Sequence, residues 1–244
     1  MPRFHCDLPL APGHVVALPD AVARHAVGVL RLRAGEAVIL FNGDGAEYHG
    51  VLESVGGKGA TARLLERREP ARESPLQVRL AQGISSGERM DYTLQKAVEL
   101  GVAAIQPLTM RRTVVRLSEE KAIKRRAHWQ GVVHAACEQC GRNVPPAVAE
   151  IREFVAWQRG LGGEDGTLKL LLDPEAELGL HDLPPPTSPV LLLAGPEGGF
   201  DPSEHKLARA AGFRGLRLGP RVLRTETAAL AALAAMQAVW GDFR

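Results

Sequence analysis

Two glycine-bearing loops near the end of the chain carry the residues best suited to hold a small ligand. They are Gly195-Pro196-Glu197-Gly198-Gly199-Phe200 and Leu218-Gly219-Pro220-Arg221-Val222-Leu223-Arg224-Thr225. Each follows a short apolar run and precedes a helix start signal, so each is expected at one edge of an α/β sheet, where ligands bind. Glycine lets the main chain bend there and approach a ligand closely. The spacing of the two loops predicts that they line one pocket together.

The residue types in these loops disfavour a phosphate ligand. The sequence has no G-x-G-x-x-G after its first strand and no G-K-[ST], two common phosphate-binding patterns. Glu197 would repel a polyphosphate, so a kinase or an NTPase fits poorly. S-adenosylmethionine fits better, because it combines a purine and a ribose with a positive sulfonium and has no phosphate. Apolar residues that could enclose the purine are Leu193, Leu218, Val222 and Leu223. Glycine-rich turns also occur without a ligand, and this alternative stays open.

Two further patterns have both a chemical and an ordinary interpretation. Cys137-Glu138-Gln139-Cys140 has the C-x-x-C spacing of zinc and redox sites, with His134 nearby. A zinc site needs a second ligand pair, so we predict reduced cysteines and no metal. The segment Arg111–Arg126 holds seven basic residues against Glu119 and Glu120. This surplus suits phosphate contacts, and it also suits a solvated helix face.

Composition limits the class of protein. The 244 residues, 45% of them hydrophobic, suffice for one or two domains with their own cores. The net charge of +2 excludes a polycation, and three cysteines do not suggest a disulfide framework. Neither a membrane span nor a signal peptide is recognisable, so we expect a cytoplasmic protein without a membrane partner.

Residues 1–70 have a mostly β pattern. Strands are predicted over 37–41, 47–52 and 59–65, and a helix over 21–30. The first two strands flank Asn42-Gly43-Asp44-Gly45, which is a strong hairpin signal. The helix would bring Arg24, Arg31 and Arg33 together. Residues 66–75 are charged, contain two prolines and lack an apolar period, so we predict a linker there and a domain boundary after residue 70.

From residue 76 strands and helices alternate, as in an α/β fold. Strands are predicted over 76–81, 102–108, 168–172, 190–194 and 213–218. Helices are predicted around Met90, Leu94, Ala97 and Val98 up to Gly101, over 119–136, from the capping sequence Asp201-Pro202-Ser203-Glu204 to Gly212, and from a Thr225 cap through Trp240. We therefore predict an α/β domain over 71–244 after a smaller β domain over 1–70.

The last predicted helix is rich in alanine and apolar nearly all round. Such a helix must be buried on more than one side. Packing within the subunit is one explanation and a subunit interface is the other. We favour the interface, because a terminal helix rarely has neighbours on every side, and we therefore expect a homodimer.

Several long segments resemble the bacterial small-subunit ribosomal RNA uridine N3-methyltransferases, the E-type enzymes of the SPOUT superfamily. They are Leu193–Phe200, Leu218–Ala228, Lys96–Val102 and Glu138–Asn143, and in the first domain Arg24–Gly35 and Phe41–Gly45. The resemblance covers nearly the whole chain. Cys140 departs from the family pattern, in which a serine is more familiar, and this argues further against a C-x-x-C site.

The resemblance implies a PUA-like RNA-binding β-barrel over 1–70 and a SPOUT methyltransferase domain with a trefoil knot over 71–244. It also implies an obligate homodimer and S-adenosylmethionine as methyl donor, held by the two loops and by Leu172-Asp173-Pro174. The cofactor-binding residues it implies are Leu172, Leu193, Gly195, Glu197, Gly198, Gly199, Leu218, Gly219, Pro220, Val222 and Leu223. No metal is implied.

The implied reaction is methylation of N3 of one uridine, U1498, in 16S rRNA, presented either as free rRNA or as the 30S subunit. The base must be unpaired and must lose its N3 proton, which calls for a cation near the anion or a carboxylate that takes the proton. Candidate catalytic residues are Arg221, Arg224, Asn143 and Glu138, with Glu197 as a further carboxylate. Candidate RNA contacts are Arg3, Arg24, Arg31, Arg33, Arg111, Arg112 and Arg142.

Two alternatives remain at the level of the sequence. One is another SPOUT RNA methyltransferase that acts on tRNA or on a ribose. The other is a non-catalytic RNA-binding assembly factor that keeps the fold. The sequence does not identify the residue that accepts the N3 proton.

Overall fold

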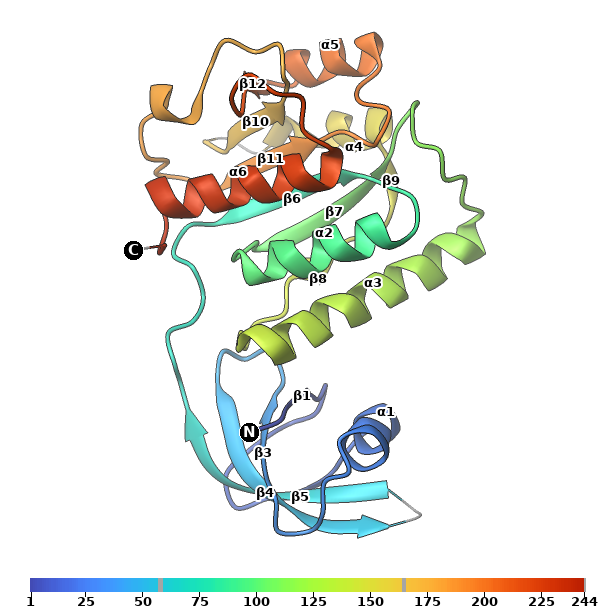
Figure 1. Cartoon of the computed structure of the whole chain (residues 1–244), viewed down its shortest axis with the longest axis vertical. Coiled ribbons are helices and arrows are strands. Elements are labelled where there is room, and N and C mark those ends of the chain that lie inside the picture. Colours follow the sequence, from blue (N-terminus) through green and yellow to red (C-terminus); the bar gives the residue numbers. More distant parts are fainter. Residues whose placement is uncertain (57–58, 164–165, 244) are drawn as a thin grey trace. The chain divides into compact units, whose positions relative to one another are not determined.

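The computed structural model describes residues 1–56, 59–163 and 166–243. It divides into two compact units (Figure 1). The first unit contains Met1–Glu73 and His134–Pro145, and the second contains Ser74–Val133 and Pro146–Arg244. Among the described residues, no helix combines the length and the apolar character needed to cross a membrane.

The first unit is built on a five-stranded sheet with the order β1-β3-β4-β5-β2. Its strands are β1 (Arg3–His5), β2 (Val15–Ala17), β3 (Ala37–Phe41), β4 (Glu47–Gly56) and β5 (Gly59–Arg68). Helix α1 (Asp20–Ala23) continues as a π-helix, η1 (Arg24–Val29), so the expected helix is confirmed but most of it is wound more widely. The predicted β3–β4 hairpin is confirmed. Phe4, Leu40, Leu52 and Leu64 are buried in the core of this unit.

The predicted linker begins too early. Glu66–Arg68 continue β5, and Arg67 and Arg68 lie opposite Tyr48 and Glu47 of β4. These pairs satisfy the backbone and place opposite charges or polar groups across the ladder, which supports a strand without any apolar period. Hydropathy alone does not detect such a strand.

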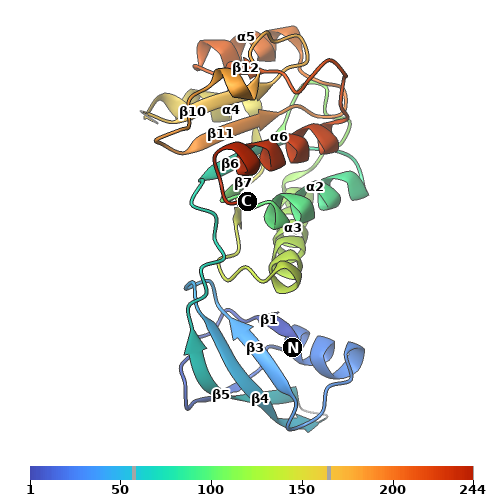
Figure 2. The same cartoon turned by 60° about the vertical axis from the view of Figure 1, so that its left-hand side comes forward.

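The second unit is built on a parallel seven-stranded sheet with the order β12-β10-β11-β6-β7-β8, and β9 also pairs with β7 (Figure 2). Its strands are β6 (Val78–Gly83), β7 (Ala104–Thr109), β8 (Ala147–Val148), β9 (Arg152–Glu153), β10 (Leu168–Leu172), β11 (Val190–Ala194) and β12 (Arg214–Leu216). Its helices are α2 (Glu88–Glu99), α4 (Phe154–Arg159), α5 (Pro202–Ala210), α6 (Thr225–Val239) and the greater part of α3 (Glu119–Cys140), with two short 3₁₀ turns, η2 (Gly160–Gly163) and η3 (Leu180–Asp182). The α/β class is confirmed.

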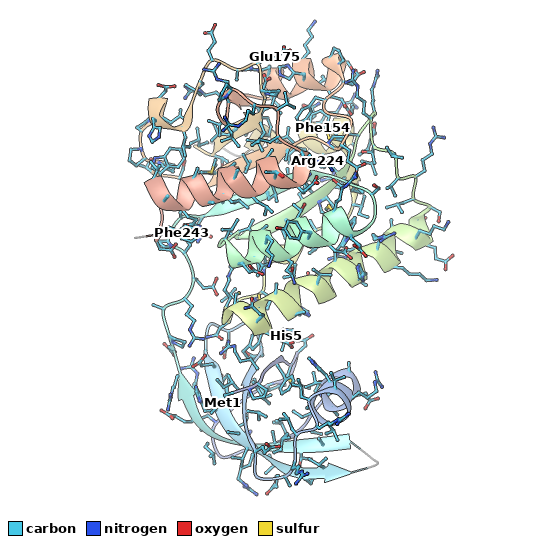
Figure 3. All side chains as sticks on the ribbon, viewed as in Figure 1. Met1, His5, Phe154, Glu175, Arg224 and Phe243 are labelled. Carbon is cyan, nitrogen blue, oxygen red and sulfur yellow. The ribbon has the colours of Figure 1, made fainter. Side chains whose placement is uncertain are left out.

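Helices cover both faces of this sheet. Helices α4 and α5 pack with Leu171, Leu191 and Leu193 on one face, where Phe154 is fully buried (Figure 3). Helices α2 and α6 lie side by side along the other face (Figures 1 and 2). Because the strands are covered on both faces, β10 and β11 read as continuous apolar runs, as their sequences predicted.

Local signals set several element boundaries, and contacts distant in the sequence set others. The capping sequence before α5 acts as expected, since Asp201 Oδ1 accepts a hydrogen bond from the backbone N of Ser203 at 2.9 Å. Thr225 was expected to cap α6, but the cap position is Arg224 and the Thr225 hydroxyl bonds elsewhere. Helix α3 extends to Cys140, and β8, β9 and α4 were not predicted.

Candidate functional site

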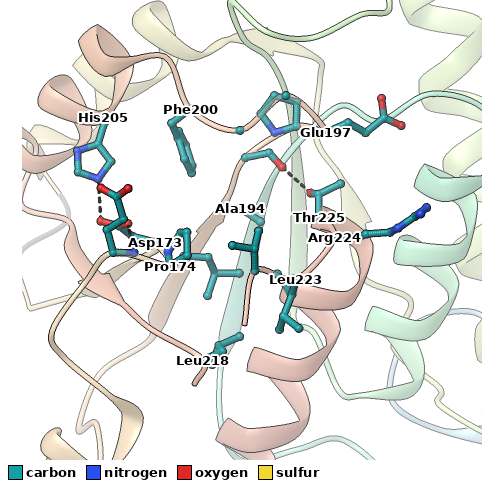
Figure 4. Close-up of a pocket in the computed structure, with 18 of the residues that line it drawn as sticks. Asp173, Pro174, Ala194, Glu197, Phe200, His205, Leu218, Leu223, Arg224 and Thr225 are labelled. Atoms are coloured by element: carbon teal, nitrogen blue, oxygen red, sulfur yellow. Dashed lines mark hydrogen bonds and ion pairs between the residues drawn. The ribbon is translucent and has the colours of Figure 1, made fainter. Parts of the chain in front are cut away.

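A pocket of about 760 Å³ lies where β10, β11 and β12 end (Figure 4). The carboxyl ends of parallel strands share one sheet edge, so the loops that follow these strands meet there. The described residues that line the pocket are Arg112, Leu172, Asp173, Pro174, Glu175, Ala194, Gly195, Pro196, Glu197, Gly198, Gly199, Phe200, Pro202, His205, Leu216, Leu218, Arg221, Val222, Leu223, Arg224, Thr225 and Ala228. The two glycine-bearing loops therefore line one pocket.

A hydrogen-bond junction joins the two loops. The Thr225 hydroxyl donates to the carbonyl O of Gly195 at 2.5 Å (Figure 4). Gln82, at the end of β6 and fully buried, donates through Nε2 to Thr225 Oγ1 at 3.0 Å and lies 3.3 Å from the same carbonyl. We call Gln82, Thr225 and the Gly195 carbonyl the loop junction. It fixes the first loop against the start of α6.

Glu197 ties the first loop to the start of α2. Its Oε1 accepts hydrogen bonds from the Ser86 backbone N at 3.1 Å, the Ser86 hydroxyl at 2.8 Å and Arg89 Nη1 at 2.5 Å. Burial acts to raise the pKa of Glu197, but the bonds from Ser86 and Arg89 outweigh it, and the pKa lies below its ordinary value. A carboxylate held as an anion is a weak proton acceptor, so this geometry favours an anchoring role for Glu197.

Asp173 is held in the same way on the other side of the pocket. Its Oδ2 lies 2.9 Å from Nε2 of His205 and 3.2 Å from Nη2 of Arg209. Burial acts to raise the pKa of Asp173, but the bond to His205 and the neighbouring donors lower it overall. Phe200 stands edge-on to the His205 ring at 6.4 Å between centroids. Asp173, His205 and Phe200 together form one wall of the pocket in Figure 4.

Three arginines supply positive charge at the pocket: Arg112, Arg221 and Arg224. Nη1 of Arg112 donates to the Gly198 carbonyl at 3.2 Å. In the described part of the chain, the guanidinium groups of Arg221 and Arg224 make no hydrogen bond or ion pair, and both residues are exposed. Their donors are therefore available to a ligand.

Glycines shape the two loops in different ways. An added Cβ at Gly195 would lie 3.0 Å from the Phe200 ring, so a side chain here would press on that ring. Gly219 has nothing within 4 Å but a φ of +78°, so this glycine is needed for its backbone conformation.

Most of the expected cofactor residues line the pocket. They are Leu172, Gly195, Glu197, Gly198, Gly199, Leu218, Val222 and Leu223. Leu193, Gly219 and Pro220 are absent from the described lining. Leu193 is buried in the core under α5, because alternate residues of β11 face opposite sides of the sheet. Val222 lies at the mouth and is 83% exposed.

The other candidate residues divide between the two units. Glu138 and Asn143 belong to the first unit, as do Arg3 and Arg142. Arg3 bonds Glu47 and Asn143, each at 2.6 Å, and Arg142 bonds Glu73 at 2.6 Å. Glu138 accepts from the His5 backbone N at 2.9 Å, and burial raises its pKa. Arg24, Arg31 and Arg33 are exposed in the first unit, and Arg111 and Arg112 in the second.

The cysteines are unpaired thiols. Cys6 and Cys137 are buried and Cys140 is half-buried. Burial raises the pKa of both Cys6 and Cys137 to about 12, so neither is a nucleophile at neutral pH. Over residues 1–56, 59–163 and 166–243, no group of three His, Cys, Asp or Glu side chains is arranged to hold a metal.

Sequence reasoning overlooked several pocket residues. Phe200 and Thr225 appeared only as members of the two loops, and His205 only within the helix predicted from Asp201. Arg112 was a candidate RNA contact and was not expected in the pocket. Gln82 carries no local signal, because a single glutamine at a strand end has no motif. Thr225 was the one overlooked residue with a local signal, because a threonine at the start of an apolar helix commonly makes a side-chain hydrogen bond.

Comparison with known proteins places these features in context. Residues 72–237 match the model of an RNA methyltransferase domain, and residues 18–65 match that of an RNA methyltransferase PUA domain. The chain is 31% identical to ribosomal RNA small subunit methyltransferase E of Buchnera aphidicola subsp. Schizaphis graminum, over 99% of this chain and 98% of that protein. It is 33% identical to the protein of the same name from Bacillus subtilis, over 87% and 85%.

Solved structures agree with these matches. The ribosomal RNA small subunit methyltransferase E of Neisseria gonorrhoeae, bound to S-adenosyl methionine, is 44% identical with a TM-score of 0.92, and the match covers 100% of both chains. A protein of Legionella pneumophila in complex with the cofactor SAM is 41% identical with a TM-score of 0.94, over 99% and 98%. The expected combination of a PUA-like first domain with a parallel-sheet α/β domain is confirmed.

Proposed function

The chain belongs to the ribosomal RNA small subunit methyltransferase E family, and from that premise we propose that it transfers the methyl group of S-adenosylmethionine to N3 of one uridine, U1498, in 16S rRNA. The observation that carries the proposal is the pocket at the ends of β10, β11 and β12, which both glycine-bearing loops line. We propose further that these loops are threaded as a trefoil knot and that the protein acts as a homodimer in the cytoplasm.

The pocket suits S-adenosylmethionine in size and chemistry. Its volume of about 760 Å³ lies within the usual range of small-molecule sites. Leu172, Leu218 and Leu223 offer apolar surface to a purine. Asp173 and Glu197 line the pocket with anionic groups that would tolerate a positive sulfonium. Both are already bonded to protein donors, which favour their charged forms. When bound, the cofactor supplies a methyl carbon on which the N3–C bond forms as the C–S bond breaks, with that electron pair left on sulfur.

The residues of the chain then have three tasks. The loop junction holds the first loop, and Glu197 anchors it to α2. Arg221 and Arg224 offer free donors at the mouth, where they would meet RNA. The exposed arginines of the first unit, Arg24, Arg31 and Arg33, would contact phosphates and position the substrate. Asn143 and Glu138 stay candidates whose donors and acceptors already serve the first unit.

Two experiments test the proposal. Titration calorimetry with S-adenosylmethionine should give a saturable heat, whereas a non-catalytic assembly factor would show no binding. Incubation with 16S rRNA or 30S subunits from a strain that lacks the methyltransferase, followed by base mapping, should give one N3-methyluridine at U1498. Methylation of a tRNA or of a ribose instead would identify a different SPOUT enzyme and refute the proposed substrate.

A further inference from the structure

Arg112 differs from the rest of the basic segment Arg111–Arg126 because its side chain lines the cofactor pocket. Nη1 of Arg112 donates to the Gly198 carbonyl at 3.2 Å. Gly198 lies so close that an added Cβ would be 2.9 Å from Cβ of Arg112. A guanidinium has five N–H donors, so the bond to Gly198 leaves several for a ligand. The first loop thus holds a cation at the pocket.

The turn that carries Arg112 is fixed by its neighbours. Met110 is buried, and the turn closes through Thr113, whose hydroxyl accepts from the Met110 backbone N at 3.0 Å and whose own N donates to the Met110 carbonyl at 3.0 Å. The backbone N of Arg111 donates to Glu204 Oε1 at 2.8 Å. A cation mounted on a fixed turn is preorganised, so it needs little rearrangement when charge develops nearby.

Glu204 connects this turn to the pocket wall. It is 1% exposed, and its second oxygen accepts from the Asp201 backbone N at 3.2 Å. Both acceptors of this buried carboxylate therefore hold backbone groups, one before α5 and one in the turn of Arg112. Pro202 and His205 of α5 line the pocket. The position of Arg112 relative to the pocket is thereby set by α5.

Few cations of the described pocket lining are available to an anionic ligand. Asp173, Glu175 and Glu197 are carboxylates, and the first and last of these are bonded to protein donors. His205 is bonded to Asp173. The cations are Arg112, Arg221 and Arg224, and of these only Arg112 is held in place by a described hydrogen bond. A uracil that has lost its N3 proton spreads its charge over N3 and the two carbonyl oxygens beside it.

We propose that Arg112 is a catalytic residue that donates to a carbonyl oxygen of the target uracil and stabilises its N3-deprotonated form. This assignment rests on the proposed N3 methylation. The N3 proton leaves to water, and N3 keeps the electron pair. That pair would form the new N–C bond to the methyl carbon as the C–S bond of the methyl donor breaks, with the C–S pair left on sulfur. Arg111 is absent from the described lining of the pocket, its side chain is 65% exposed, and its Nη1 lies 3.7 Å from Asp201 Oδ1, so we expect it to contact phosphate and not the base. Two adjacent arginines therefore have separate tasks.

The first test measures the N3 pKa of the target uracil in the absence of a methyl donor. An RNA hairpin with the target sequence carries 5-fluorouridine at the target position, and its ¹⁹F shift is followed against pH in complex with each protein. With the wild type, the N3 pKa should fall by about one unit or more relative to free RNA, as expected beside a cation. Arg112→Gln should remove most of that fall. Arg111→Gln, the matched control, should keep it while binding RNA more weakly.

The second test separates this assignment from the proposed function. With rRNA as substrate, Arg112→Gln should lower kcat about tenfold at neutral pH and move the pH–rate profile to higher pH, whereas Arg111→Gln should mainly raise KM. Equal thermal unfolding of both variants excludes misfolding. If N3-methyluridine forms but the fluorine titration is the same for wild type and Arg112→Gln, the assignment of Arg112 is overturned. If the wild type methylates another atom, the proposed function itself fails.

Discussion

Thr225 uses its hydroxyl to hold the Gly195 carbonyl, although its place before an apolar helix favoured a capping role. The cap is left without a side-chain bond, and the two pocket loops are joined instead. Gln82 completes the loop junction from β6. The Thr225 hydroxyl and Gln82 together therefore hold the two loops to each other.

Thr225→Val should weaken S-adenosylmethionine binding about fivefold to tenfold. Valine keeps the shape of threonine but removes the donor to Gly195, and the loss of one hydrogen bond costs about 1 kcal/mol. Titration calorimetry gives the affinity. Thr225→Ser keeps the hydroxyl and should bind nearly as the wild type does. Wild-type affinity in Thr225→Val would show that the loop junction does not shape the pocket.

The contribution of Glu197 to the stability of the folded protein is expected to depend on pH. Its pKa in the folded protein lies below the ordinary value of 4.5, because donors from Ser86 and Arg89 outweigh the effect of burial. Such a carboxylate stabilises the folded state above its unfolded pKa. That contribution is lost as the pH falls from about 4.5 through the lower folded pKa.

Glu197→Gln should therefore be less stable than the wild type at pH 7, and the difference should shrink as the pH falls below about 4.5. Thermal unfolding at several pH values measures the difference. Glu175→Gln is the control, because Glu175 is an exposed carboxylate of the same pocket for which no ion pair is found among the described residues. A difference that stays constant from pH 7 to pH 3 would contradict the anchoring role.

At the scale of elements, the sequence predicted those strands and helix ends whose signals lie within a few neighbouring residues. The apolar runs of β10 and β11, the Asp201 cap of α5 and the glycine after α2 all act within a few residues, so their signals are visible without the fold. The pocket itself depends on which strands are neighbours. Phe200 and His205 enter it only because β10 pairs with both β11 and β12.

Arg112 and Gln82 show the same limit more sharply. Gln82 lies near the end of β6, and Arg112 follows β7. They come close to the two loops because β6 pairs with both β11 and β7, which are distant from each other in the sequence. Nothing within a few residues of Arg112 distinguishes it from Arg111. Short pieces such as β8 and β9 were missed for a related reason, since two residues have no period to detect.

Gly195→Val should abolish cofactor binding while leaving the fold in place. The new side chain would push against the Phe200 ring, which an added Cβ alone would approach to 3.0 Å, and Phe200 lines the pocket. Calorimetry measures binding, and circular dichroism with thermal unfolding measures the fold. Gly131→Ala is the control, because an added Cβ there has nothing within 4 Å. Retained affinity in Gly195→Val would show that this loop does not hold the cofactor.

At the scale of the whole molecule, the described lining of the cofactor pocket belongs to the second unit, and we propose that exposed arginines of the first unit add phosphate contacts to RNA. The first unit includes His134–Pro145 in addition to the N-terminal residues, and Asn143 and Glu138 there bond Arg3 and His5. Removing residues 1–70 would strip these partners away, so a truncation tests folding as well as RNA binding. Substitutions of exposed arginines in the first unit give a cleaner test.

The double variant Arg24→Gln/Arg33→Gln should bind small-subunit rRNA more weakly and with a smaller salt dependence. Each lost phosphate contact reduces the slope of log K against log salt by about 0.7 to 0.9, so the slope should fall by about 1.4 to 1.8. Filter binding at several salt concentrations measures it. Affinity for S-adenosylmethionine should not change, because every described residue that lines the pocket belongs to the second unit.

Arg63→Gln is the control, since Arg63 is already paired with Glu53. If the slope of log K against log salt is unchanged in the double variant, Arg24 and Arg33 do not contact RNA phosphates. The basic segment that begins at Arg111 would then be the better candidate for those contacts.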